Sequence, residues 1–270
     1  MTPDLTFFHI SDLHFGREDR GALQWVRDAI ALEKPDAVLI TGDLTMRART
    51  SEFDAACAWI SDLGVPVTVE VGNHDLPYFN LWERFTDPYR RYHAIERLIE
   101  RELGFPGFAV VPLRTTTRAQ WRWPWVDGWV REPALAQTLA AIDALPAETR
   151  VLVTAHHPLP ERSPEGKHLT IGGTRAMAEL ARRGVAAVLT GHVHDPFDLV
   201  QETAQGHLRM IGAGTLSTRL RSTPPSYNRI ELAGSDVRVA VRNREHLATP
   251  QVQVGEVPSG PLPGETAAIA

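Results

Sequence analysis

The segment VPVTVEVGNHD, residues 65–75, contains a complete transition from a strand to a polar turn. Its first part is rich in β-branched apolar residues, as buried strands are. The strand pattern ends at Gly72, and Asn73, His74 and Asp75 follow directly before helical sequence that continues to about residue 102. A short apolar strand that ends in glycine and polar residues before a helix is typical of a parallel α/β sheet.

The same unit recurs on both sides of this segment. The apolar runs LTFFHISDLH, DAVLITGD, RVLVTAHHP and VAAVLTGHVHD also end in polar residues, and helical patterns at 21–33, 51–62 and 174–183 lie between runs. This alternation predicts βαβ units with largely parallel strands packed by helices. After residue 197 short strands follow one another without helices, and we expect them to form an antiparallel meander added to a second sheet.

Length and composition favour an ordinary globular protein. With 270 residues, 43% of them hydrophobic, the chain can bury a substantial core. We expect one domain over residues 1–246 and an extended or partly disordered tail over the Pro- and Gly-rich residues 247–270. No window approaches the roughly 18 apolar residues that span a bilayer. The start does not resemble a signal peptide, and the single Cys57 excludes an intrachain disulfide, so we expect a cytoplasmic protein.

Two further features bear on partners. A formal net charge of −5 argues against a protein that stably binds long nucleic acid, because phosphate contacts require basic surface. Residues 114–132 hold four of the seven Trp residues. They are either a hairpin whose rings cover the core, or a substrate-facing wall or an oligomer contact. Because of this Trp-rich segment and the tail, we expect a homodimer.

Side chains of the kinds that bind metals follow the predicted strands at the point where each strand ends. In parallel α/β sheets ligands bind beyond the carboxyl ends of the strands, so we expect these side chains to form one site. They are Asp12 and His14 after the first strand, Asp43 after the second, Asn73, His74 and Asp75 after the third, His156 and His157 after the next, and His192 and His194 after the last.

The spacing within the motifs favours a metal site. DLH and HVH each place two such side chains at i and i+2, which point to the same side in an extended backbone. The candidate ligands among these side chains are two Asp, one Asn and four His. They are too many for one ion, but they suffice for two ions if Asp43, alone in TGDL, bridges them. Imidazoles combined with carboxylate oxygens suit Mn, Fe, Co or Zn. His157 should point away from His156 and have a structural role, and His9 should be a hydrogen-bonded core residue.

The five motifs SDLH, GD, GNHD, HHP and GHVH, in this order, resemble the blocks of the calcineurin-like metallophosphoesterase family over about residues 5–240. The resemblance implies a four-layer α-β-β-α sandwich in which two mixed sheets are flanked by helices, and a site with two metal ions. By motif, Asp12, His14, Asp43 and His194 would hold the first metal. The second would be held by Asp43, Asn73, His156 and His192.

Within the family, SDLHFG together with GNHD resembles the bacterial cyclic-nucleotide and glycerophosphodiester phosphodiesterases. This branch implies hydrolysis of a small phosphodiester by attack of a metal-bridging hydroxide. His74 would be a catalytic residue beside the substrate oxygens, where it stabilises the transition state or protonates the leaving oxygen. Asp75 would orient the His74 imidazole or brace the turn. Arg17 could reach a phosphate, although a solvent-exposed arginine is the simpler expectation.

Three other functions compete with this one. A UDP-2,3-diacylglucosamine pyrophosphatase of lipid A synthesis usually has Arg where this chain has His74. A nuclease of the double-strand-break repair type would normally carry an additional DNA-capping domain, for which the strands after residue 197 leave little room. A non-catalytic scaffold would be expected to have lost ligands, and all of them are present here. The loops at 76–104, 114–131 and 159–173 should determine substrate choice.

Overall fold

The structure is a computed structural model that describes residues 5–99, 103–119, 125–160, 170–234 and 236–244. The predicted tail at 247–270 lies outside the described residues, and so do two of the four Trp positions of the segment 114–132. No helix within the described ranges is both long and apolar enough to cross a membrane.

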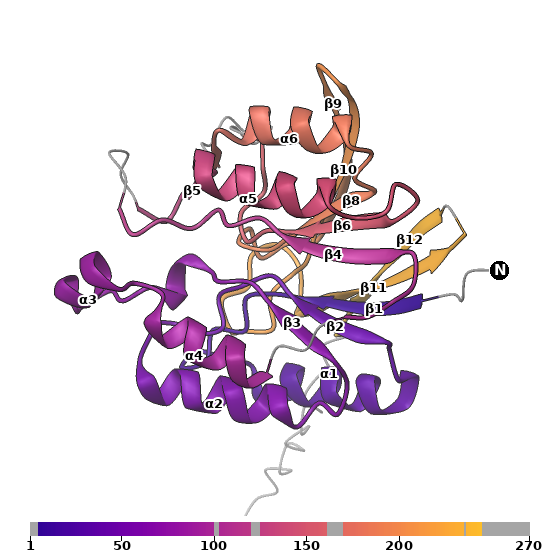
Figure 1. Cartoon of the computed structure of the whole chain (residues 1–270). Coiled ribbons are helices and arrows are strands. Elements are labelled where there is room, and N and C mark those ends of the chain that lie inside the picture. The colour runs from indigo at the N-terminus through magenta and orange to yellow at the C-terminus, as the bar shows by residue number, and fades with distance from the viewer. Residues whose placement is uncertain (1–4, 100–102, 120–124, 161–169, 235, 245–270) are drawn as a thin grey trace, which may run out of the picture.

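The first sheet has the strand order β12-β11-β1-β2-β3. Strands β1 (Leu5–Ile10), β2 (Ala37–Ile40) and β3 (Val67–Val69) run parallel. Strand β11 (Ser226–Ala233) pairs antiparallel with β1, and β12 (Asp236–Asn243) pairs antiparallel with β11 at the edge of the sheet. Figure 1 shows the last two strands beside β1, at the opposite end of the chain's colour range.

The second sheet has the order β4-β6-β8-β10-β9. Strands β4 (Phe108–Pro112), β6 (Arg150–Thr154), β8 (Ala187–Thr190) and β10 (Gly206–Gly212) are parallel, and β9 (Phe197–Thr203) pairs antiparallel with β10. Two short strands, β5 (Gly128–Trp129) and β7 (Thr170–Ile171), pair in parallel outside this sheet.

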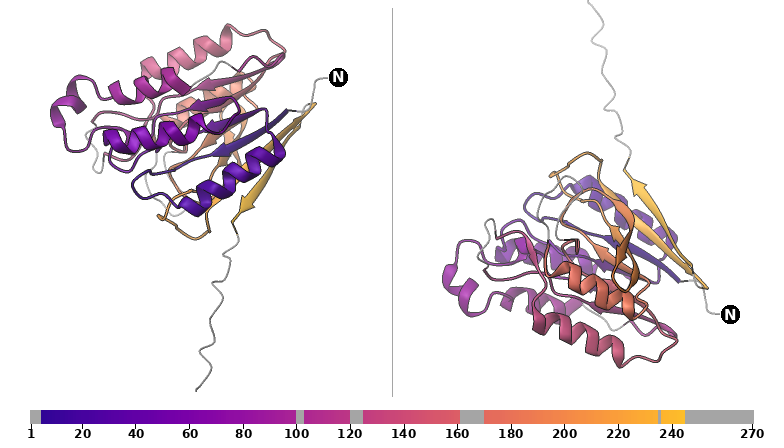
Figure 2. Two further views of the ribbon diagram at one scale, coloured as in Figure 1. Left: turned by 90° about the horizontal axis from the view of Figure 1, so that it is seen from below. Right: turned by 90° about the horizontal axis from the view of Figure 1, so that it is seen from above.

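Helices cover the outer face of each sheet, as Figures 1 and 2 show. Helices α1 (Arg20–Glu33), α2 (Thr50–Ser61) and α4 (Arg90–Ile99) lie on the first sheet. Helices α5 (Glu132–Asp143) and α6 (Gly173–Arg182) lie on the second. Between β3 and α4 the chain forms a 3₁₀ turn, η1 (Asn73–Asp75), and the short helix α3 (Leu81–Thr86). The predicted helices at 21–33, 51–62 and 174–183 are confirmed to within one residue at each end.

The core consists of three apolar layers that follow from strand alternation. Phe7 and Phe8 are both fully buried, but they point to opposite faces of β1. Phe8 packs under the helices of the first sheet, whereas Phe7 lies between the two sheets and stacks on Phe108 of β4, with ring centroids 5.1 Å apart. Because both sheets are apolar on both faces, the molecule is a four-layer α-β-β-α sandwich, as the sequence predicts.

The prediction for the strands after residue 197 was wrong in one respect. They do not form a single meander in the second sheet, because β10 runs parallel to β8 and β11 pairs with β1 of the first sheet. The pairing of Leu5 with Leu232 and of Phe7 with Ile230 places the apolar side of β11 between the two sheets. In the segment 114–132, strand β5 pairs with β7, and the backbone N–H of Trp129 donates to the carbonyl oxygen of Thr115 at 2.8 Å.

Candidate metal centre

The loops that carry the site have unusual backbone conformations. Five of the predicted ligands have positive φ angles, namely 55° at Asp12, 44° at His14, 52° at Asp43, 70° at His192 and 66° at His194. Such a conformation costs about 1–3 kcal/mol for a residue with a side chain and is concentrated at functional sites. Each turn therefore directs a polar side chain beyond the carboxyl end of its strand at the expense of local stability.

Two glycines allow these turns to approach one another closely. A Cβ atom on Gly72 would lie 2.0 Å from Oδ1 and 2.1 Å from the backbone nitrogen of Asp43. On Gly191 it would lie 1.8 Å from Oγ of Ser11 and 2.6 Å from Oδ2 of Asp12. The glycine before Asn73 and the glycine before His192 are thus required by space.

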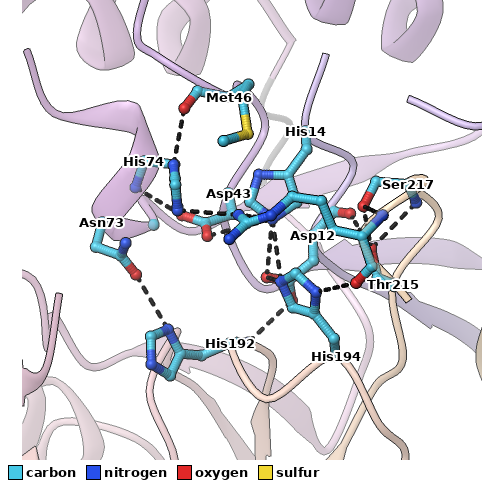
Figure 3. A network of polar contacts seen from close by, with 12 residues as sticks. Asp12, His14, Asp43, Met46, Asn73, His74, His192, His194, Thr215 and Ser217 are labelled. Atoms are coloured by element: carbon cyan, nitrogen blue, oxygen red, sulfur yellow. Dashed lines mark hydrogen bonds and ion pairs between the residues drawn. The ribbon is translucent and has the colours of Figure 1, made fainter. Parts of the chain in front are cut away.

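Asp12, His14 and His194 form the first cluster of ligand-type side chains, and all three are buried. Nε2 of His194 lies 3.1 Å from Oδ1 of Asp12 and 3.1 Å from Nε2 of His14. Figure 3 shows the three side chains pointing toward one another across the loops after β1 and β8. The second carboxylate oxygen of Asp12 accepts a hydrogen bond of 2.9 Å from the backbone N–H of His192, which fixes the carboxylate.

Asn73, His156 and His192 form the second cluster. Oδ1 of Asn73 lies 3.1 Å from Nε2 of His156 and 3.0 Å from Nδ1 of His192. Asn73 belongs to the 3₁₀ turn after β3, whereas the two imidazoles come from the loops after β6 and β8. The cluster therefore joins the two sheets at their carboxyl edge.

Asp43 lies between the two clusters and faces both. Its Oδ2 is 3.6 Å from Nε2 of His14, and its Oδ1 is 3.4 Å from Nε2 of His156. A carboxylate that offers one oxygen to each side has the geometry required of a bridging ligand. The structure thus brings together all seven side chains that the sequence predicts as ligands.

The imidazoles are held in orientations suited to metal binding. Nδ1 of His156 lies 2.7 Å from the carbonyl oxygen of Thr41, and Nδ1 of His194 lies 2.7 Å from that of Arg219. Nδ1 of His14 lies 3.3 Å from the carbonyl oxygen of Thr45. Because a carbonyl only accepts, Nδ1 carries a proton in each ring, and in the neutral form of the ring the Nε2 lone pair points to the centre of the site.

The protonation states of the site follow from burial and charge. Burial alone would raise the pKa of the Asp12 carboxyl, but His194 and His14 outweigh it and hold this pKa well below its usual range. The pKa of Asp43 is lowered in the same way, chiefly by His156. Burial lowers the pKa of His192 to about 3, with His156 adding to the effect. Both carboxylates are therefore ionised at neutral pH and His192 is a neutral imidazole, which are the forms that bind metals.

The donor set fits a pair of transition-metal ions. Oδ1 of Asp12 is buried and accepts no hydrogen bond from any described residue. Nε2 of His14 and Nε2 of His194 face each other with no hydrogen that the carbonyl-bound rings can supply. A cation bound between these atoms would satisfy all three of them. Imidazole nitrogens with carboxylate and amide oxygens are a donor set for Mn, Fe, Co or Zn.

His74 and Asp75 lie beside the clusters and differ in their surroundings. Nδ1 of His74 lies 2.7 Å from the carbonyl oxygen of Met46, and burial lowers the pKa of the ring. The Asp75 carboxylate accepts hydrogen bonds from the backbone N–H groups of Gly72, Leu44 and Thr45. Burial, with the charge of Asp43, raises the pKa of Asp75 to about 6. The contacts thus place Asp75 in the turn, where it braces the loops after β2 and β3.

Three other predicted positions can be placed. His157 does not point away from His156 as predicted, because the two ring centroids lie 4.7 Å apart. Both of its ring nitrogens are in hydrogen bonds, 2.8 Å from Oγ1 of Thr115 and 2.8 Å from the carbonyl oxygen of Val126. His9 is a buried, hydrogen-bonded core residue as expected, with Nε2 3.0 Å from Oγ1 of Thr41. Arg17 is exposed on the loop after β1.

Sequence reasoning missed Arg219. Its Nη1 lies 3.0 Å from Nε2 of His74 and 3.3 Å from Nε2 of His14. The residue lies beyond the carboxyl end of β10, a strand whose pattern predicts an antiparallel meander, so its end is not expected at the site. Treating β10 as parallel would have included the loop 213–219.

Comparison with known proteins agrees with this geometry. The family model described as calcineurin-like phosphoesterase matches residues 5–196. The chain belongs to this family. Calcineurin-like phosphoesterases bind a dinuclear transition-metal centre, and this member has clusters of His and Asp side chains that could hold metal ions.

Individual relatives of this phosphoesterase extend the comparison. The SbcD nuclease, a component of SbcCD, from Staphylococcus saprophyticus is 25% identical over 217 residues, which are 72% of this chain and 58% of that protein. The chain therefore spans less than two thirds of that relative's length. A dimetal phosphatase from Danio rerio superposes with a TM-score of 0.64 at 17% identity, covering 88% of this chain and 96% of the other. A purple acid phosphatase from yellow lupin has a TM-score of 0.63 at 13% identity, covering 90% and 52%. These two likenesses show the fold.

Proposed function

We propose that this chain is a dinuclear metal-dependent phosphodiesterase that hydrolyses a small phosphodiester, such as a cyclic nucleotide or a glycerophosphodiester. The observation that carries the proposal is the position of Asp43, whose two carboxylate oxygens face two separate clusters of ligands. Asp12, His14, Asp43 and His194 would hold one ion, and Asp43, Asn73, His156 and His192 the other.

When bound, two such ions lower the pKa of a water molecule for in-line attack and neutralise charge on the phosphoryl oxygens. The protein's own residues fix the ligands for that task. Asp75 braces the turn that presents Asn73 and His74, and the carbonyl groups of Thr41 and Arg219 orient His156 and His194.

We assign His74 to the substrate side of the centre. Its backbone N–H donates to Oδ1 of Asp43 at 2.8 Å, and its ring lies beside His14, with centroids 4.8 Å apart. With Nδ1 donating to the Met46 carbonyl, Nε2 of the neutral ring has no proton. In this form Nε2 cannot protonate the leaving oxygen, and its lone pair is available to accept a hydrogen bond.

Two observations support a diester as substrate. The motifs SDLHFG and GNHD resemble the phosphodiesterase branch of the family, and a relative at 25% identity is a nuclease, an enzyme that cleaves phosphodiester bonds. The same relative supports a second candidate function, cleavage of DNA. The net charge of −5 favours the small diester, because DNA binding depends on basic surface.

A substrate panel tests the proposal. Purified protein with added Mn²⁺ should hydrolyse bis(p-nitrophenyl) phosphate faster than p-nitrophenyl phosphate, and Asp43→Ala should abolish both activities. Cyclic AMP, glycerophosphodiesters, UDP-2,3-diacylglucosamine and single-stranded DNA then compare the candidate substrates. Preference for the monoester would reject the diester assignment. Absence of hydrolysis with every metal would favour a non-catalytic scaffold.

We further propose a cytoplasmic homodimer. Large apolar side chains are exposed around α3, among them Phe79 at 76% and Trp82 at 77%, and α3 projects from the body of the molecule (Figure 1). An apolar surface of this kind commonly marks an interface. Light scattering of the purified protein should give twice the chain mass, and a monomer would refute the proposal.

A further inference from the structure

Arg219 places a guanidinium group at the centre of the site. Its Nη1 lies 3.0 Å from Nε2 of His74 and 3.3 Å from Nε2 of His14. In the described part of the chain the guanidinium pairs with no carboxylate, unlike Arg209 of β10, which binds Asp198 through two nitrogens. The side chain of Arg219 is half-buried and is therefore held at the site without a counterion.

The backbone of Arg219 is fixed relative to the ligands. Its carbonyl oxygen accepts the 2.7 Å hydrogen bond from Nδ1 of His194, and its N–H donates to Oγ of Ser217 at 3.2 Å. Thr215 Oγ1, 2.7 Å from that Ser217 oxygen, donates to the carbonyl oxygen of Asp12 at 2.7 Å. Figure 3 shows Thr215 and Ser217 next to Asp12 and His194. A residue tied in this way can change its side-chain direction without leaving the site.

Charge determines what such a guanidinium can do once metals are bound. Arginine stays protonated at all working pH values, and two metal cations on the neighbouring imidazoles and carboxylates would repel it. The arrangement becomes favourable when an anion lies between the guanidinium and the ions. The planar fork of arginine donors matches the oxygens of a phosphoryl group, and such charge-assisted hydrogen bonds are among the strongest in proteins.

We propose that Arg219 binds a non-bridging oxygen of the substrate's phosphoryl group on the side of the centre that faces His74. This inference rests on the proposed phosphodiesterase function and extends it by naming the residue that holds the phosphoryl group from the protein side. His74 also positions Arg219. Its Nδ1 is committed to the Met46 carbonyl, so Nε2 accepts a hydrogen bond from Nη1 and steers the guanidinium.

Anion binding to the Mn²⁺-loaded protein tests this proposal without relying on turnover. The variants are Arg219→Ala, Arg219→Lys and the matched control Arg221→Ala, which removes an exposed arginine two positions away. Calorimetric titration with inorganic phosphate gives the Kd, and elemental analysis gives the Mn content. Arg219→Ala should weaken phosphate binding about 10- to 100-fold with unchanged Mn content. Arg219→Lys should restore part of the loss, and Arg221→Ala should match the wild type.

Kinetics separate binding from a structural effect. With bis(p-nitrophenyl) phosphate, Arg219→Ala should raise KM and lower kcat. In a double-mutant cycle with His74→Ala, the double variant should bind phosphate no more weakly than Arg219→Ala alone, because His74 acts on phosphate binding through Arg219.

Wild-type phosphate affinity in Arg219→Ala would overturn the proposal, as would loss of Mn from both Arg219 variants. If the wild type hydrolyses no diester yet its phosphate binding depends on Arg219, the proposed function fails and the anion site stands.

Discussion

Asn73 is the residue on which the second ion depends. Its amide oxygen lies within 3.1 Å of one ring nitrogen of His156 and of His192. As a neutral ligand it leaves more positive charge on the centre than a carboxylate would, which favours an anionic phosphate. Asn73→Ala should therefore lower metal content from two ions toward one and reduce turnover by at least about 10- to 100-fold. Elemental analysis of the variant with two ions still bound would disprove the assignment of Asn73 as a ligand.

His74 should be dispensable for metal binding. Its Nδ1 lies 2.7 Å from the Met46 carbonyl oxygen, and we assign its Nε2, 3.0 Å from Nη1 of Arg219, to that guanidinium and not to an ion. His74→Ala should reduce kcat while the protein keeps two metal ions per chain. Metal analysis and steady-state kinetics on the same preparation check this, and a fall in metal content would make His74 a ligand.

Asp75 should be important for stability. Its buried carboxylate accepts hydrogen bonds from the N–H groups of Gly72, Leu44 and Thr45, so an amide NH₂ at this position would face donors. Asp75→Asn should destabilise the fold by about 1–3 kcal/mol, measured by urea unfolding. Asp54→Asn on the exposed face of α2 is the control and should change stability by less than about 0.5 kcal/mol. Equal stability of the two variants would contradict the bracing role.

At this scale the sequence predicts the ligand set well and the supporting groups poorly. Aspartate, asparagine and histidine at strand ends are visible as residue types, so all seven candidate ligands could be named. The carbonyl groups of Thr41, Thr45 and Met46 orient imidazoles through atoms that every residue has, and they leave no compositional signal. Arg219 was missed for a different reason. The strand before it, β10, was predicted to be antiparallel, whereas it runs parallel to β8.

The strand-to-loop junctions are the elements that determine the site. Gly191 follows β8 against the turn after β1, where an added Cβ would lie 1.8 Å from Oγ of Ser11. Gly191→Ala should separate the two loops, destabilise the fold by about 1–3 kcal/mol and reduce metal binding. Gly104→Ala is the matched control, since a Cβ there meets no atom within 4 Å. Thermal unfolding and metal content of both variants measure the effect, and identical behaviour would show that the close approach is unimportant.

Elements with strong periodicity were predicted and weakly patterned ones were not. The parallel strands β1, β2 and β8 are continuous apolar runs, and their helices have clear apolar faces. In α5 (EPALAQTLAAID) the buried residues Leu135, Thr138 and Ile142 include a polar one, which weakens the apolar pattern. Strand β4 has only five residues and ends in Pro112, a residue tolerated there because β4 is an edge strand.

At the scale of the whole molecule, the two-sheet architecture follows from the family motifs, whereas the return of β11 to β1 does not. Both sheets contain antiparallel strands. The sequence alone does not tell which sheet β11 joins, because that depends on contacts between the two sheets. Ile230 and Leu232 are buried between the sheets when β11 lies beside β1. Burial by residues that are distant in the sequence leaves no pattern in the local sequence of β11.

Metal binding by the whole protein should be coupled to proton release. Burial would lower the pKa of His156, but the charge of Asp43 outweighs it and raises this pKa to about 9 in the metal-free protein. His156 is thus protonated at pH 7, and a metal must displace that proton. Apparent affinity for Mn²⁺ should therefore rise with pH up to about 9. Calorimetry at neutral pH in two buffers of different ionisation enthalpy measures the released protons, and identical enthalpies in both buffers would contradict the expected release.

Anomalous diffraction from crystals of the Mn²⁺-loaded protein would locate the ions themselves. Two peaks about 3.5–4 Å apart are expected, with Asp43 contacting both. One should lie among Asp12, His14 and His194, and the other among Asn73, His156 and His192. A single peak, or a peak held by His157 in place of Asn73, would contradict the dinuclear centre described here.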